Sequence, residues 1–461
     1  MRYVSTRGLT PPQSFKDVLL AGLAPDGGLF VPEEYPQYHE GTIDTMRGLN
    51  YTQAAQIILA DFIDDIPTVE LNKIIARTYT PNMAPHLKWL DEDLALLALS
   101  NGPTLSFKDQ ALQLLGRLME YVLREKDEKL NILGATSGDT GSAAEYAYRG
   151  REGMQVFMLS PYGRMSRFQQ QQMYSLNDPS IHNLVVDGNF DDCQAIVKAV
   201  NADACFKEKH RIGAVNSINW ARIAAQVVYW AYASLQATKK PGDVIDVSVP
   251  SGNFGNALSA YIAKRMGFPI RNIIVATNEN DVLHEFFRYG FYRIRAGDDV
   301  KITSSPSMDI ASASNFERLM FDCVDRDAYR LRLLLDTLQL IGRFVMSDKS
   351  QSLDGFCSGS ATDEEVIRTI RTVYTGYGAT IDPHTAVGMK VAFDYQYTHT
   401  DVPLIVAETA HPAKFADTIR EALEVEPPIP KGYEMFGTLP EHITRVPADP
   451  AVIKQYIMEH V

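Results

Sequence analysis

The chain has 461 residues, a length typical of two to four domains. Its residues are 45% hydrophobic and 22% charged, and no apolar run approaches the ~20 residues of a membrane-spanning helix, so a membrane protein is not expected. The net charge of -13 argues against nucleic acid as a partner, because phosphate backbones attract basic surfaces. The N-terminal sequence does not resemble a secretory signal, and we expect a cytoplasmic protein.

Residues 1–95 are predicted to form a mainly helical region. Apolar residues recur at helical spacing over Tyr51–Phe62 and Val69–Tyr79, and glycines and prolines interrupt the pattern between such segments. A further helical stripe of apolar residues follows Asp109. A last short helix is predicted near residues 451–458.

The middle of the chain alternates short apolar runs with amphipathic helical patterns. This alternation is typical of parallel α/β sheets whose strands are joined by crossover helices. The glutamine run Gln169–Gln172 is expected to form a solvated helix face. The runs predicted to be strands are residues 131–135, 155–159, 183–186, 244–249, 272–276 and 403–407.

A lysine stands at the start of the helix predicted near Asp109. Ser106 and Asp109 fit the [ST]-x-x-[DE] capping box, which places Lys108 in the first helical turn. The helix dipole disfavours a cation there, and a lysine kept partly deprotonated is what a Schiff base requires. Taken alone, a lysine at such a position is more often a solvated surface residue.

Two similar loops join a predicted strand to a helix. In Ser251–Asn256, glycines permit a tight turn while backbone N–H groups converge at the helix N-terminus, which suits a phosphate. This loop has neither the lysine of a P-loop nor the spacing of a dinucleotide fingerprint. In Thr136–Gly141, hydroxyl and N–H groups form a cradle that suits a carboxylate. Each loop alone is also compatible with a turn that binds nothing.

Lys108 and the two loops together favour pyridoxal-phosphate chemistry. That chemistry needs a lysine, a phosphate cradle and a partner for the ring nitrogen of the cofactor. Thr409 follows the predicted strand at residues 403–407, and open α/β sheets bind ligands at the carboxyl ends of their strands. Thr409 is therefore a candidate partner of the ring nitrogen, although a threonine here is equally compatible with a helix cap.

No metal site is predicted. The lone histidines His384 and His411 lack metal-ligand spacing and are interpreted as structural residues. The cysteines are widely spaced without a C-x-x-C pair, which indicates neither a zinc site nor a disulfide framework. They are Cys193, Cys205, Cys323 and Cys357.

Several long motifs resemble those of the threonine synthase family, whose members are fold-type II pyridoxal-phosphate enzymes. The similarity extends over nearly the whole chain and implies an α/β fold. Two open α/β domains around a central cleft are expected, with an N-terminal, mainly helical domain. The motifs that carry the resemblance are residues 21–31, 102–109, 135–141, 216–219 with Arg222, 249–255, 276–281 and 409–415.

The resemblance also implies the domain boundaries and the reaction. The N-terminal domain is expected over residues 1–95, a large domain that binds pyridoxal 5'-phosphate over residues 96–125 and 225–461, and a small substrate domain over residues 126–224. The implied reaction converts O-phospho-L-homoserine and water to L-threonine and phosphate, the last step of threonine biosynthesis.

The resemblance assigns roles residue by residue. Lys108 is the catalytic residue and forms the imine bond to the cofactor, while Thr409 faces the ring nitrogen. The residues implied to bind the cofactor phosphate are Gly252, Asn253, Phe254, Gly255 and Asn256. Those implied to bind the amino-acid end of the substrate are Thr136, Ser137, Gly138, Asp139 and Thr140. Candidates for the substrate phosphate are Arg164, Ser166, Asn219 and Arg222.

Other activities on the same scaffold remain alternatives at this point. A phospho-lyase would let the same substrate collapse to 2-oxobutyrate, and a serine/threonine dehydratase would share the lysine and the phosphate cradle but need no second phosphate site. A non-catalytic module that binds a phosphorylated metabolite would have no use for Lys108. The expected partner is the small-molecule substrate, with neither nucleic acid nor membrane, and the chain is expected to be a monomer or homodimer.

Overall fold

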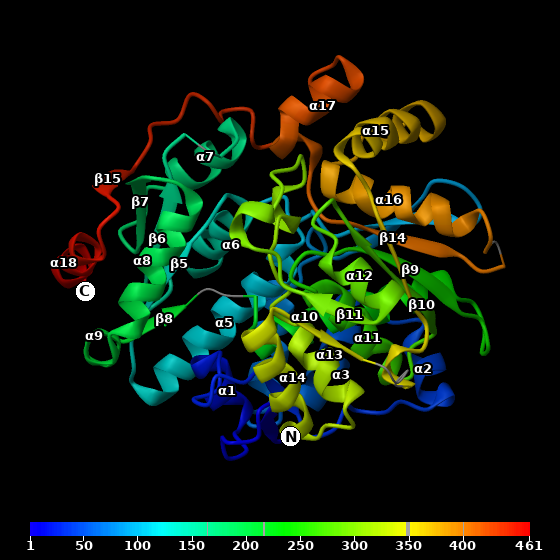
Figure 1. The fold of residues 1–461 in the computed structure, drawn as a ribbon, viewed down its shortest axis with the longest axis horizontal. Helices are drawn as coiled ribbons and strands as arrows, with labels where there is room; N and C mark the ends of the chain where they lie inside the picture. The colour runs from blue at the N-terminus through cyan, green and yellow to red at the C-terminus, as the bar shows by residue number, and fades with distance from the viewer. Residues whose placement is uncertain (164, 215–216, 347–350, 400) are drawn as a thin grey trace. The chain divides into compact units, whose positions relative to one another are not determined.

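The computed structural model describes residues 1–163, 165–214, 217–346, 351–399 and 401–461 (Figure 1). The chain forms two compact units. The larger unit contains Met1–Asn101, Ser217–Pro412 and Ala416–Pro427. The smaller unit contains Gly102–Asn216, Ala413–Phe415 and Pro428–Val461.

The larger unit is built on a mainly parallel sheet with the strand order β13-β10-β9-β14-β4-β3, in which only the pairing of β3 with β4 is antiparallel among the described residues. Strands β4 and β14 are near-continuous apolar runs, as expected where both faces of a sheet are covered. The bounds are β3 (His86–Trp89), β4 (Leu94–Ala98), β9 (Ile245–Pro250), β10 (Ile270–Thr277), β13 (Phe356–Ser360) and β14 (Leu404–Glu408).

Helices surround this sheet, and two short antiparallel pairs accompany it, β1 (Tyr3–Ser5) with β2 (Phe30–Pro32) and β11 (Phe291–Arg293) with β12 (Arg343–Val345). The helices are α1 (Phe15–Ala21), α2 (Glu40–Met46), α3 (Tyr51–Phe62), α4 (Thr68–Thr78), α10 (Trp220–Ala237), α11 (Gly255–Arg265), α12 (Val282–Tyr289), α13 (Phe316–Cys323), α14 (Ala328–Ile341), α15 (Asp363–Tyr377), α16 (Pro383–Gln396) and α17 (Ala416–Leu423).

The smaller unit contains a parallel sheet with the order β15-β7-β6-β5-β8. Its strands are β5 (Leu130–Ala135), β6 (Met154–Pro161), β7 (Ile181–Asp187), β8 (Ile212–Ala214) and β15 (Thr444–Pro447). Its helices are α5 (Lys108–Lys126), α6 (Asp139–Tyr148), α7 (Arg167–Tyr174), α8 (Phe190–Ala202), α9 (Ala204–Lys209) and α18 (Pro450–His460). The predicted strands and helices are confirmed, since each predicted run lies within one of these elements or overlaps it with slightly shifted ends.

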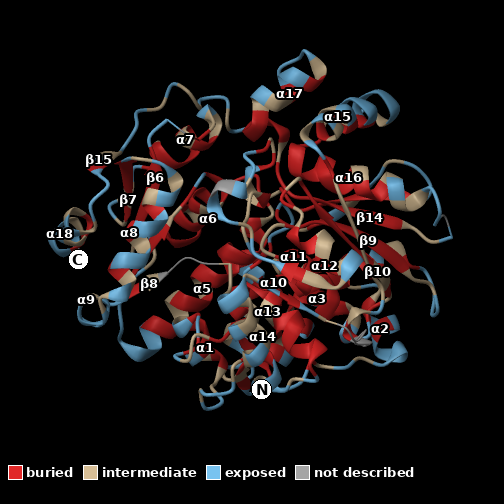
Figure 2. Ribbon diagram, in the orientation of Figure 1, coloured by how far each residue is buried: buried red, intermediate tan, exposed pale blue. Residues whose placement is uncertain are grey.

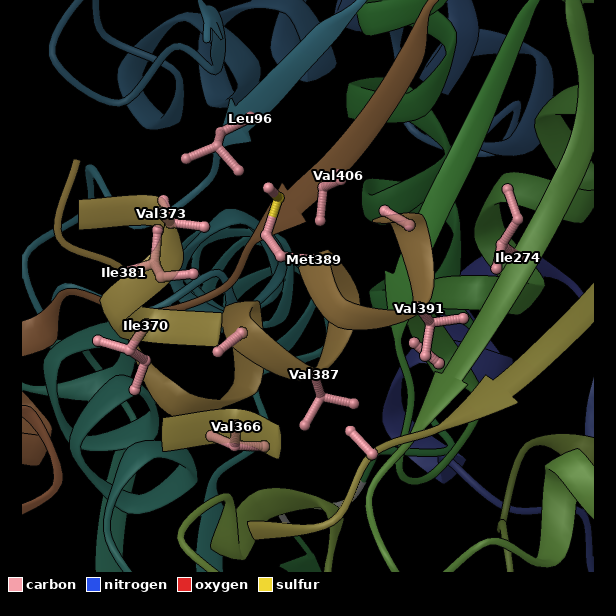
Figure 3. Close-up of a cluster of buried hydrophobic side chains, with 14 of the residues drawn as sticks. Leu96, Ile274, Val366, Ile370, Val373, Ile381, Val387, Met389, Val391 and Val406 are labelled. Atoms are coloured by element: carbon pink, nitrogen blue, oxygen red, sulfur yellow. The ribbon is translucent and has the colours of Figure 1, made fainter. Parts of the chain in front are cut away.

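Each unit has its own apolar core, and the strands of both sheets are largely buried (Figure 2). In the larger unit, Leu96, Ile274 and Val406 of the sheet lie against side chains of α15 and α16, among them Ile370 and Met389 (Figure 3). In the smaller unit, apolar side chains of β5, β6 and β7 pack against α8 and α18. The strand ends are therefore held rigidly where the predicted functional loops begin.

The two compact units differ from the three predicted domains. The prediction places residues 96–125 in the large domain, whereas α5 belongs to the smaller unit because it packs along α6. Helices α1 to α4, predicted as a separate domain, belong to the larger unit. In the described part of the chain, no helix is both long and apolar enough to cross a membrane.

Candidate active site

Lys108 is the first residue of α5, as predicted, but the helix start is built differently from the predicted capping box. The N-cap residue Phe107 makes no side-chain cap hydrogen bond, and the Ser106 hydroxyl accepts the backbone N–H of Lys108 at 3.4 Å. The carboxylate of Asp109 turns back to Thr104. It accepts the Thr104 backbone N–H at 2.7 Å and the Thr104 hydroxyl at 2.9 Å. Burial raises the pKa of Asp109 to about 6. The capping-box prediction is therefore wrong, because the N-cap is Phe107 and Thr104 holds the carboxylate.

Beside Lys108 lies the carboxylate of Asp139, at the start of α6. The Nζ of Lys108 is 3.7 Å from Asp139 Oδ2. The other oxygen, Oδ1, accepts hydrogen bonds from the Nζ of Lys414 at 2.8 Å and from the Nε2 of Gln169 at 2.9 Å. All four side chains are at least nine-tenths buried. Lys414 and Gln169 are members of this cluster that the sequence did not assign to the site.

The predicted carboxylate cradle, residues 136–140, lies between β5 and α6. The hydroxyl of Thr136 accepts the backbone N–H groups of Gly138 at 3.0 Å and Gly141 at 2.8 Å, so it shapes the loop from within. Gly138 has φ = 140°, a conformation that favours glycine. Ser137 is exposed and Thr140 is half-exposed. These two hydroxyls are better placed than Thr136 to contact a ligand.

Ser166 is tied to the same cluster through Gln169. Ser166 caps α7, and its hydroxyl accepts the backbone N–H of Gln169 at 3.3 Å while the Gln169 side chain reaches back. The prediction that Gln169–Gln172 forms a solvated face is wrong, because Gln169, Gln171 and Gln172 are all buried. The amides of Gln169 and Gln172 pair with the buried side chains of Asp139 and Lys414, and the amide of Gln171 pairs with Glu441. Arg164 lies outside the described residues.

In the larger unit, the predicted phosphate loop Gly252–Asn256 joins β9 to α11. Phe254 precedes the helix in a left-handed conformation, with φ = 64°. A Cβ at Gly252 would lie 2.7 Å from the backbone oxygen of Ser307, so only glycine fits this close approach of two backbones. The carbonyl oxygen of Asn253 accepts the backbone N–H of Asn315 at 3.1 Å. The loop is thus fixed with the N-terminus of α11 directed as a phosphate site requires.

The Asn256 side chain is held by α10. Its Oδ1 accepts the hydroxyl of Tyr229 and the Nε1–H of Trp230, both at 2.8 Å. Its Nδ2 is buried and has no hydrogen-bond partner within the described residues. Because the oxygen is already bonded, the amide presents a donor, which suits an anion.

Two buried hydroxyls lie at the end of neighbouring strands of the larger sheet. The hydroxyls of Ser251 and Thr409 are buried and make no hydrogen bond in the part of the chain that the structure describes. Ser251 follows β9 and Thr409 follows β14, which are neighbouring parallel strands, so both hydroxyls lie at the same edge of the sheet. Unsatisfied buried hydroxyls are uncommon in native proteins. A cofactor with a phosphate and a ring nitrogen would satisfy such groups, so these residues fit pyridoxal phosphate.

A network around Asp382 holds this edge of the larger sheet. Asp382 is fully buried ahead of α16, and its Oδ1 accepts the backbone N–H and the ring Nδ1–H of His384, both at 2.9 Å. Its Oδ2 accepts the hydroxyl of Thr385, whose oxygen accepts the backbone N–H of Thr409 at 3.1 Å. The Nε2 of His384 accepts the backbone N–H of Ser307 at 3.2 Å. Through Thr385 and His384, the Asp382 carboxylate therefore fixes both the backbone of Thr409 and Ser307, whose backbone oxygen closely approaches Gly252.

Asn219 and Arg222 lie at the start of α10 and are 5% exposed. The Asn219 side chain caps this helix, accepting the Ala221 N–H at 3.0 Å and donating to the Leu19 carbonyl at 2.9 Å. Its amide thus already has structural contacts, whereas the Arg222 guanidinium adds a buried positive charge. Their role at a substrate phosphate stays a prediction.

The chain matches three family models that follow one another along the sequence. Residues 2–79 match the model "Threonine synthase N terminus", residues 81–335 the model "Pyridoxal-phosphate dependent enzyme", and residues 385–457 the model "Threonine synthase, C-terminal". The middle match includes Lys108 and the phosphate loop, and the last includes Thr409.

Curated relatives and solved structures agree with these matches. The chain is 52% identical to the threonine synthase of Methylobacillus glycogenes, with all of both chains covered, and 48% identical to that of Corynebacterium glutamicum, covering 100% of this chain and 99% of the relative. The crystal structure of a pyridoxal-phosphate-bound threonine synthase from Brucella melitensis superposes with a TM-score of 0.95 at 42% identity, covering 100% of this chain and 99% of the other. The predicted fold class is confirmed, and the chain belongs to the threonine synthase family of pyridoxal-phosphate-dependent enzymes.

Proposed function

We propose that this enzyme converts O-phospho-L-homoserine and water to L-threonine and phosphate, as the family resemblance implies. The observation that carries the cofactor assignment is the pair of buried hydroxyls, Ser251 and Thr409, which lack a partner within the described residues. They lie beside the glycine loop at the carboxyl ends of two neighbouring strands, where open α/β sheets bind ligands. Full-length similarity to threonine synthases supports the choice of reaction.

The residues that we propose to hold the cofactor have separate tasks. Lys108 bonds the cofactor aldehyde, and Thr409 presents a neutral hydroxyl to the ring nitrogen. The backbone N–H groups of Gly252, Asn253, Phe254, Gly255 and Asn256 hold its phosphate at the N-terminus of α11. When bound, pyridoxal phosphate withdraws electrons from the amino-acid carbon of the substrate.

The remaining steps are assigned to side chains of this chain. Once the amino group of the substrate has taken its place, the freed amine of Lys108 would take the proton from the substrate α-carbon and return protons later in the reaction, as a general base and acid. The N-terminus of α6, with Ser137, Gly138, Asp139 and Thr140 after Thr136, holds the substrate carboxylate. Arg164, Ser166, Asn219 and Arg222 are proposed to bind the substrate phosphate, for which arginine offers paired N–H donors.

The assignment of Lys108 is tested by trapping the cofactor. Borohydride reduction of the purified holoenzyme fixes pyridoxal phosphate on the lysine that bonds it, and peptide mapping identifies that lysine. We expect the label on Lys108 and its loss in Lys108→Ala. The matched control is Lys126→Ala, which removes an exposed lysine at the other end of α5 and retains the label. A label on another lysine of the wild-type protein would show that Lys108 has a different role.

A cytoplasmic location and a monomeric or homodimeric state stay predictions. Gel filtration with light scattering measures the oligomeric state directly.

A further inference from the structure

Arg318 is a fully buried arginine of α13 in the larger unit, and the proposed reaction does not use it. Its Nε donates to the Phe30 carbonyl at 3.0 Å, its Nη1 to Asn315 Oδ1 at 2.5 Å and its Nη2 to the Ile218 carbonyl at 2.6 Å. Burial lowers the pKa of Arg318 to about 10, so the guanidinium stays charged at neutral pH. A guanidinium has N–H donors in a rigid plane and no acceptor, so each partner must present an oxygen to it.

This requirement fixes the orientation of the Asn315 amide. Asn315 is fully buried at the N-cap position of α13, yet its side chain makes no cap hydrogen bond there. Because Oδ1 faces the donors of Arg318, Nδ2 is free to donate on the other side of the amide. It donates to the carbonyl oxygens of Asn253 at 3.2 Å and Ser217 at 3.1 Å. The backbone N–H of Asn315 donates to the Asn253 carbonyl as well, at 3.1 Å, so two N–H groups hold this one oxygen.

The Asn253 carbonyl belongs to the peptide group that joins Asn253 to Phe254 in the predicted phosphate loop. In a trans peptide the carbonyl and the following N–H point in opposite directions, so the Phe254 N–H is directed away from Asn315. Phe254 has φ = 64°, which a bulky residue rarely adopts and which persists only where the surroundings enforce it. The two hydrogen bonds from Asn315 supply that constraint.

Arg318 is itself anchored at two distant points of the larger unit. The Phe30 carbonyl belongs to β2, and the Ile218 carbonyl lies just before α10. With both ends of the guanidinium occupied, its remaining donor stays directed at Asn315. If the amide of Asn315 turned over, its NH2 group would face the Arg318 donor and its oxygen would face two carbonyl oxygens. The buried network therefore permits a single orientation of this amide.

We propose that Asn315, oriented by Arg318, is a positioning residue that aims the Phe254 N–H at the cofactor phosphate. This inference rests on the proposed binding of that phosphate by the loop Gly252–Asn256. It predicts that Asn315 matters for the phosphate of the cofactor and not for its imine bond to Lys108.

The test compares pyridoxal phosphate with pyridoxal, which has the same aldehyde and ring nitrogen but no phosphate. Equilibrium dialysis of the full chain, stripped of cofactor, gives both dissociation constants, and their ratio measures the contribution of the phosphate. Asn315→Asp keeps the oxygen that faces Arg318 but places a second oxygen opposite two carbonyls. The pyridoxal phosphate constant should rise about tenfold and the pyridoxal constant by less than about twofold, since a hydrogen bond to a charged group is misaligned. A merely structural role would weaken both ligands alike and leave the ratio unchanged.

The matched control is Asn131→Asp. Asn131 is buried in β5 of the smaller unit, and its Nδ2 also donates to a carbonyl, that of His210, at 2.6 Å. This variant undergoes the same chemical change without a contact to the phosphate loop and should keep the wild-type ratio. If Asn315→Asp does not fold, Asn315→Ala removes the donor without adding an oxygen and should lower the ratio about threefold.

Gly252→Ala separates failure of this inference from failure of the loop assignment. A wild-type ratio in the Asn315 variants, together with a lowered ratio in Gly252→Ala, would overturn the role of Asn315 alone. A wild-type ratio in all of these variants would overturn the binding of the phosphate by this loop, and the inference with it. Because no substrate is present, neither result depends on which reaction the enzyme catalyses.

Discussion

The backbone N–H of Thr409 donates a hydrogen bond of 3.1 Å to the hydroxyl oxygen of Thr385. The Thr385 hydroxyl in turn donates to the fully buried carboxylate of Asp382. The backbone of Thr409 is thus fixed by the fold, while its own hydroxyl has no partner among the described residues. Thr385 therefore has a task in the fold, and the hydroxyl of Thr409 is the one proposed to face the ring nitrogen of the cofactor.

Thr385→Val should destabilise the protein even without cofactor. Valine keeps the shape of the side chain but leaves the Thr409 N–H without its buried partner and Asp382 Oδ2 with only the backbone N–H of Thr385, at 3.4 Å. An unpaired buried N–H costs about 1–3 kcal/mol. The urea midpoint of the cofactor-free chain measures this loss. Thr372→Val is the matched control, because Thr372 is exposed and bonds only its own helix. Equal midpoints for the two variants would contradict the role of Thr385.

Thr409→Val, in contrast, should weaken cofactor binding but leave the stability of the cofactor-free chain nearly unchanged. The Thr409 hydroxyl makes no hydrogen bond within the described residues, so its removal should leave the cofactor-free stability within about 0.5 kcal/mol. The dissociation constant for pyridoxal phosphate should rise about tenfold, the worth of one hydrogen bond. Equilibrium dialysis measures the constant. An unchanged affinity would show that Thr409 does not face the cofactor.

Gly252→Ala should weaken cofactor binding and lower stability by about 1–3 kcal/mol. The added Cβ would lie 2.7 Å from the Ser307 oxygen and 3.1 Å from the Met308 Cα, so two backbones must separate. Gly376→Ala provides the control, since a Cβ there meets nothing within 4 Å and Gly376 is the next-to-last residue of α15, a helix in which alanine is favoured over glycine. If Gly252→Ala and Gly376→Ala both bind pyridoxal phosphate with wild-type affinity, the proposed role of the Gly252 loop is wrong.

Glu145→Gln should become increasingly more stable than the wild type as the pH rises. Burial holds the pKa of Glu145 well above its usual range, whereas the unfolded chain loses this proton near pH 4.3. The folded state thus binds more protons above about pH 4.3, and the wild type loses about 1.4 kcal/mol per pH unit until the folded pKa is reached. Glutamine has no such loss. Urea midpoints of both proteins at about pH 5, 6 and 7 measure the difference in stability between Glu145→Gln and the wild type. If Glu145 titrated normally, this difference would stay constant over that range.

Local features of the fold were predictable from the sequence, because their causes are local. The apolar runs at residues 131–135 and 403–407 lie within β5 and β14, and the capping sequence at Asn50 starts α3 where the periodicity predicts it. The short strands β8 and β15 were not predicted. Each has three or four residues, too few to show a period of their own.

The details of the candidate site depend on contacts between distant residues, which leave no local pattern. Gln172 is buried because Lys414, 242 positions later, donates to it, and a glutamine run alone indicates only a polar helix face. The capping box predicted at the start of α5 is wrong because the Asp109 carboxylate accepts the backbone N–H and the hydroxyl of Thr104. Lys108 could be predicted as a site residue since its motif is contiguous, whereas the contacts of Asp382 and Lys414 were not predicted.

The most direct test of the proposed function is the set of products formed from O-phospho-L-homoserine. The purified holoenzyme is incubated with this substrate, and threonine, inorganic phosphate and 2-oxobutyrate are measured in the same samples, with Lys108→Ala as the inactive control. We expect threonine and phosphate in equal amounts, without 2-oxobutyrate. Release of phosphate with 2-oxobutyrate in place of threonine, or no release of phosphate by the wild-type holoenzyme, would contradict the proposed function.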